Sequence, residues 1–109
     1  NFPHNGHIDN IPADWTVEMT CTIGRDGATP HPRLTHFDDK VLGLIHTIKG
    51  FEIAASAAAI SGELNDVLLA MNLSPLIHSD KDAEVLAREM LLAHEALLPN
   101  FAKTIAALK

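Results

Sequence analysis

The feature that most constrains the fold is a single strand-forming segment followed only by helix-forming ones. Polar and apolar residues alternate strictly from Thr16 to Ile23, and this two-residue period predicts a β-strand. The sequence Gly24-Arg25-Asp26-Gly27 predicts a tight hairpin turn, and any returning strand is short because Pro30 cannot donate a ladder hydrogen bond. Because one or two strands do not form a stable sheet alone, we expect this strand to pair outside the sequence or with a second copy.

The remainder of the chain carries the periodicity of amphipathic helices. A capping-box pattern at Thr35 and Asp38 predicts a helix from about Phe37 to Ile60, and Gly62 is its predicted stop. Ser79 is the predicted cap of a later helix. The apolar stripes predicted to face the core are, helix by helix, Phe37, Val41, Leu44 or Ile45, Ile48, Ala55 and Ala59; Leu64, Val67, Leu68 and Met71; Ala83, Leu86, Met90, Ala93 and Leu97; and Phe101, Ile105 and Leu108. The predicted fold is α+β and mostly α, a hairpin or strand followed by three to four helices in a single domain of residues 1–109.

Two glycines in the first predicted helix favour a packing interface. Gly43 and Gly50 lie two turns apart, and each costs about 1 kcal/mol relative to Ala in a helix interior. Close packing against another element usually offsets such a cost, and the Ala-rich segment 54–59 has the same implication. We therefore expect this helix to contribute to a homo-oligomer.

Composition and charge limit the kinds of molecule that the chain is expected to bind. The formal net charge is -6 at pH 7, which opposes binding to nucleic acid and to anionic lipid. No apolar run approaches the length of a membrane span, and the lone Cys21 gives no sign of an oxidising compartment. The first residues lack both an initiator Met and the pattern of a signal peptide. These features predict a cytoplasmic protein cut from a longer chain.

The sequence contains no convincing active site. Tyrosine is absent, and neither a dinucleotide fingerprint nor a nucleophile elbow occurs. Seven histidines, among them the pairs His4 with His7 and His31 with His36, could bind a metal, but a metal site requires three or four converging ligands, which the sequence alone does not show. Cys21 is expected to be a small buried hydrophobe. No catalytic or metal-binding residue is therefore assigned.

Several segments together resemble the C-terminal region of glycoside hydrolase family 4. Each segment is weak by itself, whereas their order and spacing are specific. Departures such as Thr20 in place of a common Pro and Phe51 in place of a common Tyr leave the substrate branch open. The matching segments are residues 5–14 (NGHIDNIPAD), 17–21 (VEMTC), 48–52 (IKGFE) with Ala57 and Ala58, 68–76 (LLAMNLSPL) and 97–101 (LLPNF).

The resemblance is closest to the branch that hydrolyses 6-phospho-β-glucosides. It implies the C-terminal part of a two-domain enzyme with a lactate dehydrogenase-like C-terminal domain, whose NAD takes a hydride from C3 of the sugar while Mn²⁺ stabilises an enolate. It also implies that the nucleotide-binding domain, the metal ligands and the tyrosine base precede this chain, and that Cys21 is not the family's metal-ligating cysteine. Asn5, Gly6 and Asn10 are then expected near the substrate and cofactor cleft. Their alternative roles are backbone freedom at Gly6 and a local turn bond at Asn10.

Three alternatives stay open. The parent enzyme could belong to the α-glucosidase, α-galactosidase or uronidase branches of the same family. The chain could instead be a stand-alone helical interaction module, or a small His-rich metal-binding protein. In the favoured interpretation the partner is a phosphorylated disaccharide, and the 109-residue chain alone is expected to be inactive.

Overall fold

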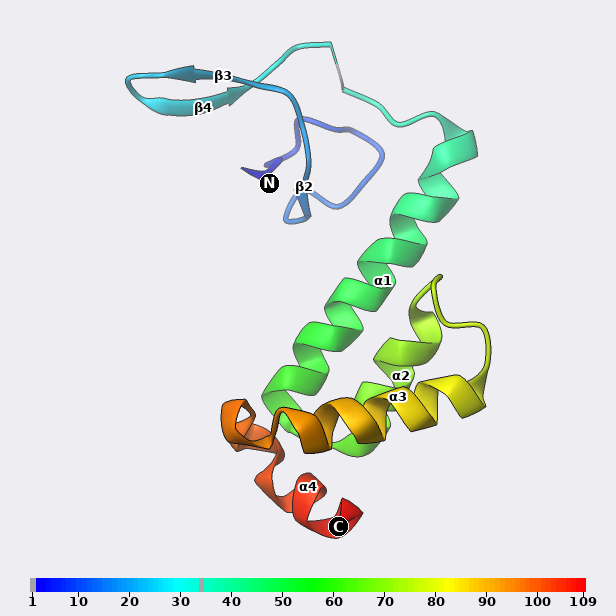
Figure 1. Cartoon of the computed structure of the whole chain (residues 1–109). Coiled ribbons are helices and arrows are strands. Elements are labelled where there is room, and N and C mark those ends of the chain that lie inside the picture. The colour runs from blue at the N-terminus through cyan, green and yellow to red at the C-terminus, as the bar shows by residue number, and fades with distance from the viewer. Residues whose placement is uncertain (1, 34) are drawn as a thin grey trace. The chain divides into compact units, whose positions relative to one another are not determined.

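A computed structural model describes residues 2–33 and 35–109, which form two compact units, residues 1–42 and 43–109 (Figure 1). The first unit contains short strands and loops, and the second is helical. The long helix α1 (Asp39–Ser61) begins in one unit and ends in the other. The expectation of an α+β fold that is mostly α is confirmed.

The first unit contains two separate two-stranded sheets in its described part. Strand β1 (Phe2–Pro3) pairs with β2 (Thr16–Val17), and β3 (Cys21–Gly24) pairs with β4 (Gly27–Pro30), both antiparallel. Gly27 closes the β3–β4 turn with a φ of 107°, a conformation that favours glycine. The predicted hairpin is thus confirmed, and its return strand ends at Pro30.

The predicted continuous strand Thr16–Ile23 is wrong. Residues 18–20 are not in a strand, and the two halves of the segment have different partners. The first half pairs with residues 2–3, in a region expected to be only loop, and the second half pairs with its own hairpin. The strict alternation therefore covers two short strands, each of which pairs with a different strand.

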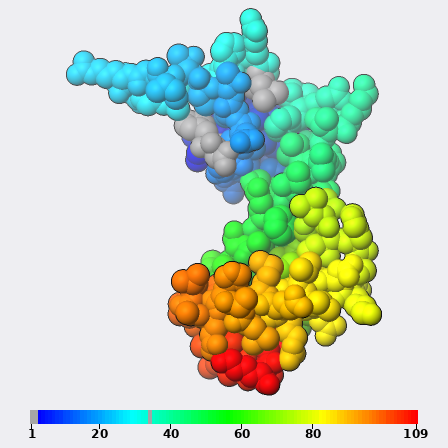
Figure 2. All heavy atoms as spheres, viewed as in Figure 1, coloured from blue at the N-terminus to red at the C-terminus, as the bar shows by residue number. Residues whose placement is uncertain are grey.

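The hairpin contributes little to a core. Figure 2 shows it as a narrow arm, and Ile23 is 76% exposed. Cys21, expected to be buried, is only half-buried, with its sulfur 3.5 Å from the carbonyl oxygen of Met19. A two-stranded hairpin has no second layer to cover its faces, so alternation alone does not make its apolar side chains buried.

Helix α1 begins two residues later than predicted, and its capping group differs. The carboxylate of Asp38 accepts a hydrogen bond of 2.9 Å from the backbone N–H of Lys40, so Asp38 rather than Thr35 caps the helix. Phe37 precedes the helix instead of opening its apolar stripe. The stop at Gly62 is confirmed, because its φ is 71° and its N–H bonds to the carbonyl of Ala58.

Most of α1 is uncovered. By length and composition alone the helix is long and apolar enough to cross a membrane, and nearly all of its residues are unburied. The expectation that no apolar run approaches the length of a membrane span is therefore wrong for this helix. The sequence-predicted stripe is largely exposed, with Val41, Leu44 and Ile48 all open to solvent.

The expected close packing at Gly43 and Gly50 is absent from the described part of the chain. A Cβ built at either position would meet nothing within 4 Å. Neither glycine therefore permits a close approach between elements of this chain. Whether a second copy packs there stays a prediction.

The second unit has its core where its last elements meet. Helices α2 (Leu64–Leu73) and α3 (Asp80–Ala93) lead through the 3₁₀ turns η1 (Glu95–Leu97) and η2 (Pro99–Phe101) to α4 (Ala102–Leu108). Leu91, Phe101 and Ile105 form a buried cluster. The partly buried side chains packed against it are Leu64, Val67, Leu92, Leu98 and Leu108.

The face of α3 that points into the core differs from the predicted face by about one residue around the helix. Ala83 is buried as predicted, but Leu86, Met90 and Leu97 are exposed, whereas Ala87 and Leu91 are buried. Helix α2 contacts α3 extensively, and the small alanines permit that close approach. The face with the smallest side chains, rather than the most apolar one, therefore packs inward. The Ser79 cap is confirmed, since its hydroxyl oxygen accepts from the Asp82 N–H.

Candidate functional site

The N-terminal loop (residues 4–14) begins with a tight turn at His4-Asn5-Gly6-His7. The N–H of His7 donates to the carbonyl of His4 at 2.9 Å, and Asn5 and Gly6 have φ values of 50° and 82°. Two consecutive positive φ angles are typical of type I′ turns, for which Asn-Gly is a preferred sequence. Gly6 thus has the backbone freedom that was its alternative role.

His4 lies in the centre of this loop and is 1% exposed. Its Nδ1 accepts from the N–H of Ile8 at 3.2 Å, and its Nε2 lies 2.6 Å from the carbonyl oxygen of Pro12. Nδ1 is therefore the acceptor and Nε2 carries the proton. Because both nitrogens are engaged with backbone inside the loop, His4 holds the loop together rather than presenting a ligand group.

Asn10 connects the loop to the segment that leads into α1. Its amide nitrogen donates to the carbonyl of Phe37 at 2.8 Å, and its amide oxygen accepts from the N–H of Phe37 at 3.0 Å. The N–H of Asp9 donates to the carbonyl of Thr35 at 2.9 Å. The expectation of a hydrogen bond within a local turn at Asn10 is therefore wrong, because the residue that Asn10 bonds to lies 27 residues away in the chain.

An imidazole–carboxylate pair lies beside this connection. The Nδ1 of His36 is 2.6 Å from a carboxylate oxygen of Asp9, and its Nε2 is 3.4 Å from the amide nitrogen of Asn10. This network makes Nδ1 the donor to Asp9. A base oriented by a carboxylate is a component of catalytic triads, but the group on its other nitrogen here is an amide rather than a nucleophile. This pair could not be predicted from the sequence, because its members lie 27 residues apart in the chain.

Asn5, Gly6 and Asn10 thus share one loop, and the structure assigns each a structural bond or backbone conformation. A role near a substrate cleft stays a prediction. The histidines are dispersed: His7 points its Nε2 at the carbonyl of His31 at 3.2 Å, and His94 bonds to the carbonyl of Met90. Within residues 2–33 and 35–109, no group of three His, Cys, Asp or Glu side chains is placed to hold a metal ion.

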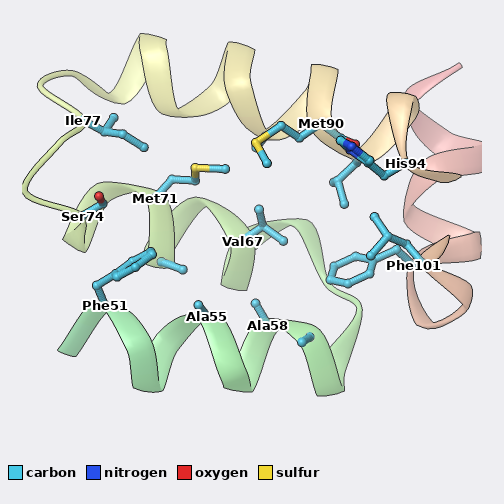
Figure 3. Close-up of a pocket in the computed structure, with 15 residues that line it drawn as sticks. Phe51, Ala55, Ala58, Val67, Met71, Ser74, Ile77, Met90, His94 and Phe101 are labelled. Atoms are coloured by element: carbon cyan, nitrogen blue, oxygen red, sulfur yellow. The ribbon is translucent and has the colours of Figure 1, made fainter. Parts of the chain in front are cut away.

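The second unit holds an apolar pocket of about 600 Å³, formed by α1, α2 and α3 (Figure 3). Phe51, Ala55 and Ala58 line it from α1, and Met71 lines it from α2. Met90 and His94 also line it, and both are exposed. With almost no polar group in its wall, the pocket suits apolar side chains or ligands rather than a sugar phosphate. A smaller pocket of about 200 Å³ in the first unit is lined by Met19, Thr20, His31 and Arg33.

Comparison with known families identifies the chain. The C-terminal domain of family 4 glycosyl hydrolases matches residues 1–77, which include the N-terminal loop, the hairpin, α1 and α2. The chain belongs to glycosyl hydrolase family 4. The resemblance carried by segments such as 5–14 and 68–76 is thereby confirmed.

Two relatives with similar names align with nearly all of this chain. A 6-phospho-β-glucosidase of Escherichia coli (strain K12) is 81% identical over all 109 residues. A probable 6-phospho-β-glucosidase of Bacillus subtilis (strain 168) is 40% identical over 107 residues, 98% of the chain. The family 4 chain spans about a quarter of the length of both relatives, 24% in each case.

The residues of this family 4 segment do not fit either expected cofactor. Manganese would require several convergent ligands, and the described residues offer no such group. A dinucleotide would require a glycine-rich turn between a strand and a helix, but the glycines at 24 and 27 close a β-hairpin instead. No step of a reaction is therefore assigned to these residues.

Proposed function

We propose that this chain is the C-terminal part of a 6-phospho-β-glucosidase that depends on NAD and a divalent metal. The observation that carries the proposal is the 81% identity with the E. coli relative over the whole chain. The more distant B. subtilis relative supports the same proposal, because it carries the corresponding name. The substrate class is accordingly a phosphorylated β-glucoside, such as a phosphorylated disaccharide.

The contribution of this segment is to support the enzyme rather than to perform the chemistry. NAD would supply reversible oxidation of the sugar, and Mn²⁺ would supply Lewis-acid stabilisation of negative charge. Both would be held by residues outside this chain. The loop that contains Asn5, Gly6 and Asn10 is proposed to border the cleft, held rigid by the bonds to His4 and Phe37.

The test compares the 109-residue chain with a hybrid enzyme. In the hybrid, the preceding three-quarters of the E. coli relative is joined to this chain in place of its own matching region. The substrate is 4-nitrophenyl 6-phospho-β-glucoside with NAD, Mn²⁺ and a thiol reductant. We expect hydrolysis by the hybrid, none by the 109-residue chain, and loss of hydrolysis after treatment with a chelator.

Matched substrates make the result specific. The same assay with the unphosphorylated β-glucoside and with the 6-phospho-α-glucoside should give little or no product. Hydrolysis of the α-anomer alone would contradict the proposed branch, and hydrolysis by the isolated chain would contradict the supporting role. Homo-oligomerisation and a cytoplasmic location belong to the same proposal, and light scattering of the hybrid tests the first of them.

A further inference from the structure

The apolar pocket of the second unit continues along α1 as an exposed apolar stripe. Phe51, Ala55 and Ala58 line the pocket. Ile48 lies three residues before Phe51 and Leu44 lies seven residues before it, so both share the pocket face of the helix. Ile48 is 38% exposed and Leu44 is also open to solvent. One face of α1 is therefore covered only in its second half.

Helix α3 extends this apolar surface on the other side of the pocket. Met90 lines the pocket and is 50% exposed. Leu86, one turn earlier on α3, is also exposed. Figure 3 shows Met90 and Met71 directed into the space between the helices, with Met71 above Phe51 and Ala55. Contiguous apolar surface of this kind marks a binding surface.

We propose that this surface receives an apolar segment of the polypeptide that precedes the chain in the full-length enzyme. We call the surface the α1–α3 face and define it by Leu44, Ile48, Phe51, Leu86 and Met90. The inference rests on the proposed function, in which this chain is the C-terminal part of a longer enzyme. Its occupant presents bulky apolar side chains, because the wall of the pocket offers them contacts and offers almost no polar partners.

The length of the missing polypeptide favours this occupant. The chain is 24% of the length of both relatives, so about three-quarters of such an enzyme lies outside it. A segment tethered in the same polypeptide has an effective concentration in the millimolar range for a short flexible connection. Such a segment therefore binds the face in preference to a second copy, because the second copy must bind from solution.

The charges on α1 oppose a lipid occupant. Lys49 and Glu52 form an ion pair near the midpoint of the helix. If α1 crossed a bilayer, these charges would lie near the hydrocarbon centre, where charged side chains are strongly disfavoured. A protein segment needs to cover only one face of the helix, and Lys49 projects away from the face that Leu44, Ile48 and Phe51 share.

The first experiment measures methionine oxidation by hydrogen peroxide, followed by peptide mass spectrometry, with free N-acetylmethionine as the rate reference. It compares the hybrid enzyme described above with the 109-residue chain. Because susceptibility follows exposure, we expect Met90 to react about tenfold more slowly in the hybrid. The protection should not change when the hybrid is diluted. Equal rates in the two proteins would overturn the inference, as would protection that disappears on dilution, which indicates a second copy.

Paired variants of the hybrid locate the contact. Ile48→Asp places a charge on the α1–α3 face, and Ile53→Asp places the same charge on the opposite face of the same helix, where Ile53 is 54% exposed. We expect Ile48→Asp to restore the oxidation rate of Met90 and Ile53→Asp to leave it unchanged. Equal effects of the two substitutions would overturn the inference. Should Ile48→Asp prevent folding, the comparison of the unsubstituted proteins still decides it.

The outcome is separable from that of the proposed function. A hybrid that protects Met90 but hydrolyses none of the phosphorylated glucosides refutes the activity and leaves the contact standing. An active hybrid in which Met90 reacts as fast as in the isolated chain refutes the contact and leaves the activity standing.

Discussion

The side-chain amide of Asn10 uses both of its polar groups on the backbone of one residue, Phe37. It donates to the Phe37 carbonyl at 2.8 Å and accepts from the Phe37 N–H at 3.0 Å. Phe37 lies two residues before α1, so the amide fixes the approach to that helix. A side chain that mimics a backbone partner in this way links two segments that secondary structure does not connect.

Asn10→Ala should therefore destabilise the first unit. It removes both hydrogen bonds and leaves the part-buried groups of Phe37 without a partner, a loss of about 1–3 kcal/mol in the free energy of unfolding. Chemical denaturation followed by the fluorescence of Trp15 measures it, because Trp15 lies in the same unit. The control is Asn65→Ala at an exposed position of α2, which should change stability by less than about 0.5 kcal/mol. Similar losses in the two variants would contradict the role of Asn10.

His4→Ala should be costly for a different reason. The substitution leaves a void at a site that is 1% exposed. It removes the acceptor of the Ile8 N–H and one of two donors to the Pro12 carbonyl, which keeps its bond from the Trp15 N–H. We expect a loss of about 2–4 kcal/mol, the range for truncating a large buried side chain. The matched control is His78→Ala, since His78 is exposed. Thermal unfolding of the two variants gives the comparison, and an unchanged transition in His4→Ala would rule out its central position in the loop.

Two glycine-to-alanine substitutions at the ends of α1 should have opposite signs. At Gly62 the φ of 71° disfavours a side chain, and a Cβ would overlap the carbonyl oxygen of Asn100. Gly62→Ala should destabilise the chain by more than about 1 kcal/mol. Gly43→Ala, with open space around the Cβ, should stabilise it by about 0.5–1 kcal/mol. Urea denaturation of the 109-residue chain tests both, and destabilisation by Gly43→Ala would show that an unseen neighbour approaches that position.

Removal of the Ser79 cap should weaken α3. The Ser79 hydroxyl accepts from the Asp82 N–H at 3.1 Å and donates to the Asp82 carboxylate at 2.8 Å. Ser79→Ala should cost about 1 kcal/mol. Ser56→Ala on the exposed surface of α1 is the control, because its hydroxyl bonds only to a carbonyl within its own helix and should matter little. Circular dichroism during thermal unfolding measures both, and equal stability of the two variants would argue against the cap.

The C-terminal end of α1 shows how distant residues complete a local element. The side chain of Asn100 donates to the carbonyl of Ala59 at 3.0 Å, and the hydroxyl of Thr104 donates to the carbonyl of Gly62 at 2.6 Å. The last carbonyls of a helix have no partner within it. The sequence marks the stop through Gly62, whereas the groups that satisfy these carbonyls come from more than 40 residues away.

Local sequence patterns were enough to predict the kinds of elements, several of their ends and the resemblance to the family. Turn glycines, capping residues and helical periods depend on neighbours within a few positions, so the hairpin at Gly27, the stop at Gly62 and the cap at Ser79 were predictable. The ordered segments from 5–14 to 97–101 likewise sufficed for the resemblance to family 4, since they are a property of the chain alone.

What each element packs against could be learned only from the folded chain. It divided Thr16–Ile23 between two partners, turned Ala87 rather than Leu86 inward, and joined Asn10 to Phe37. These outcomes depend on which distant surfaces approach one another and how closely their side chains permit them to pack. A periodic pattern records that a face is apolar, but burial is a property of two surfaces, and one sequence segment contains only one of them.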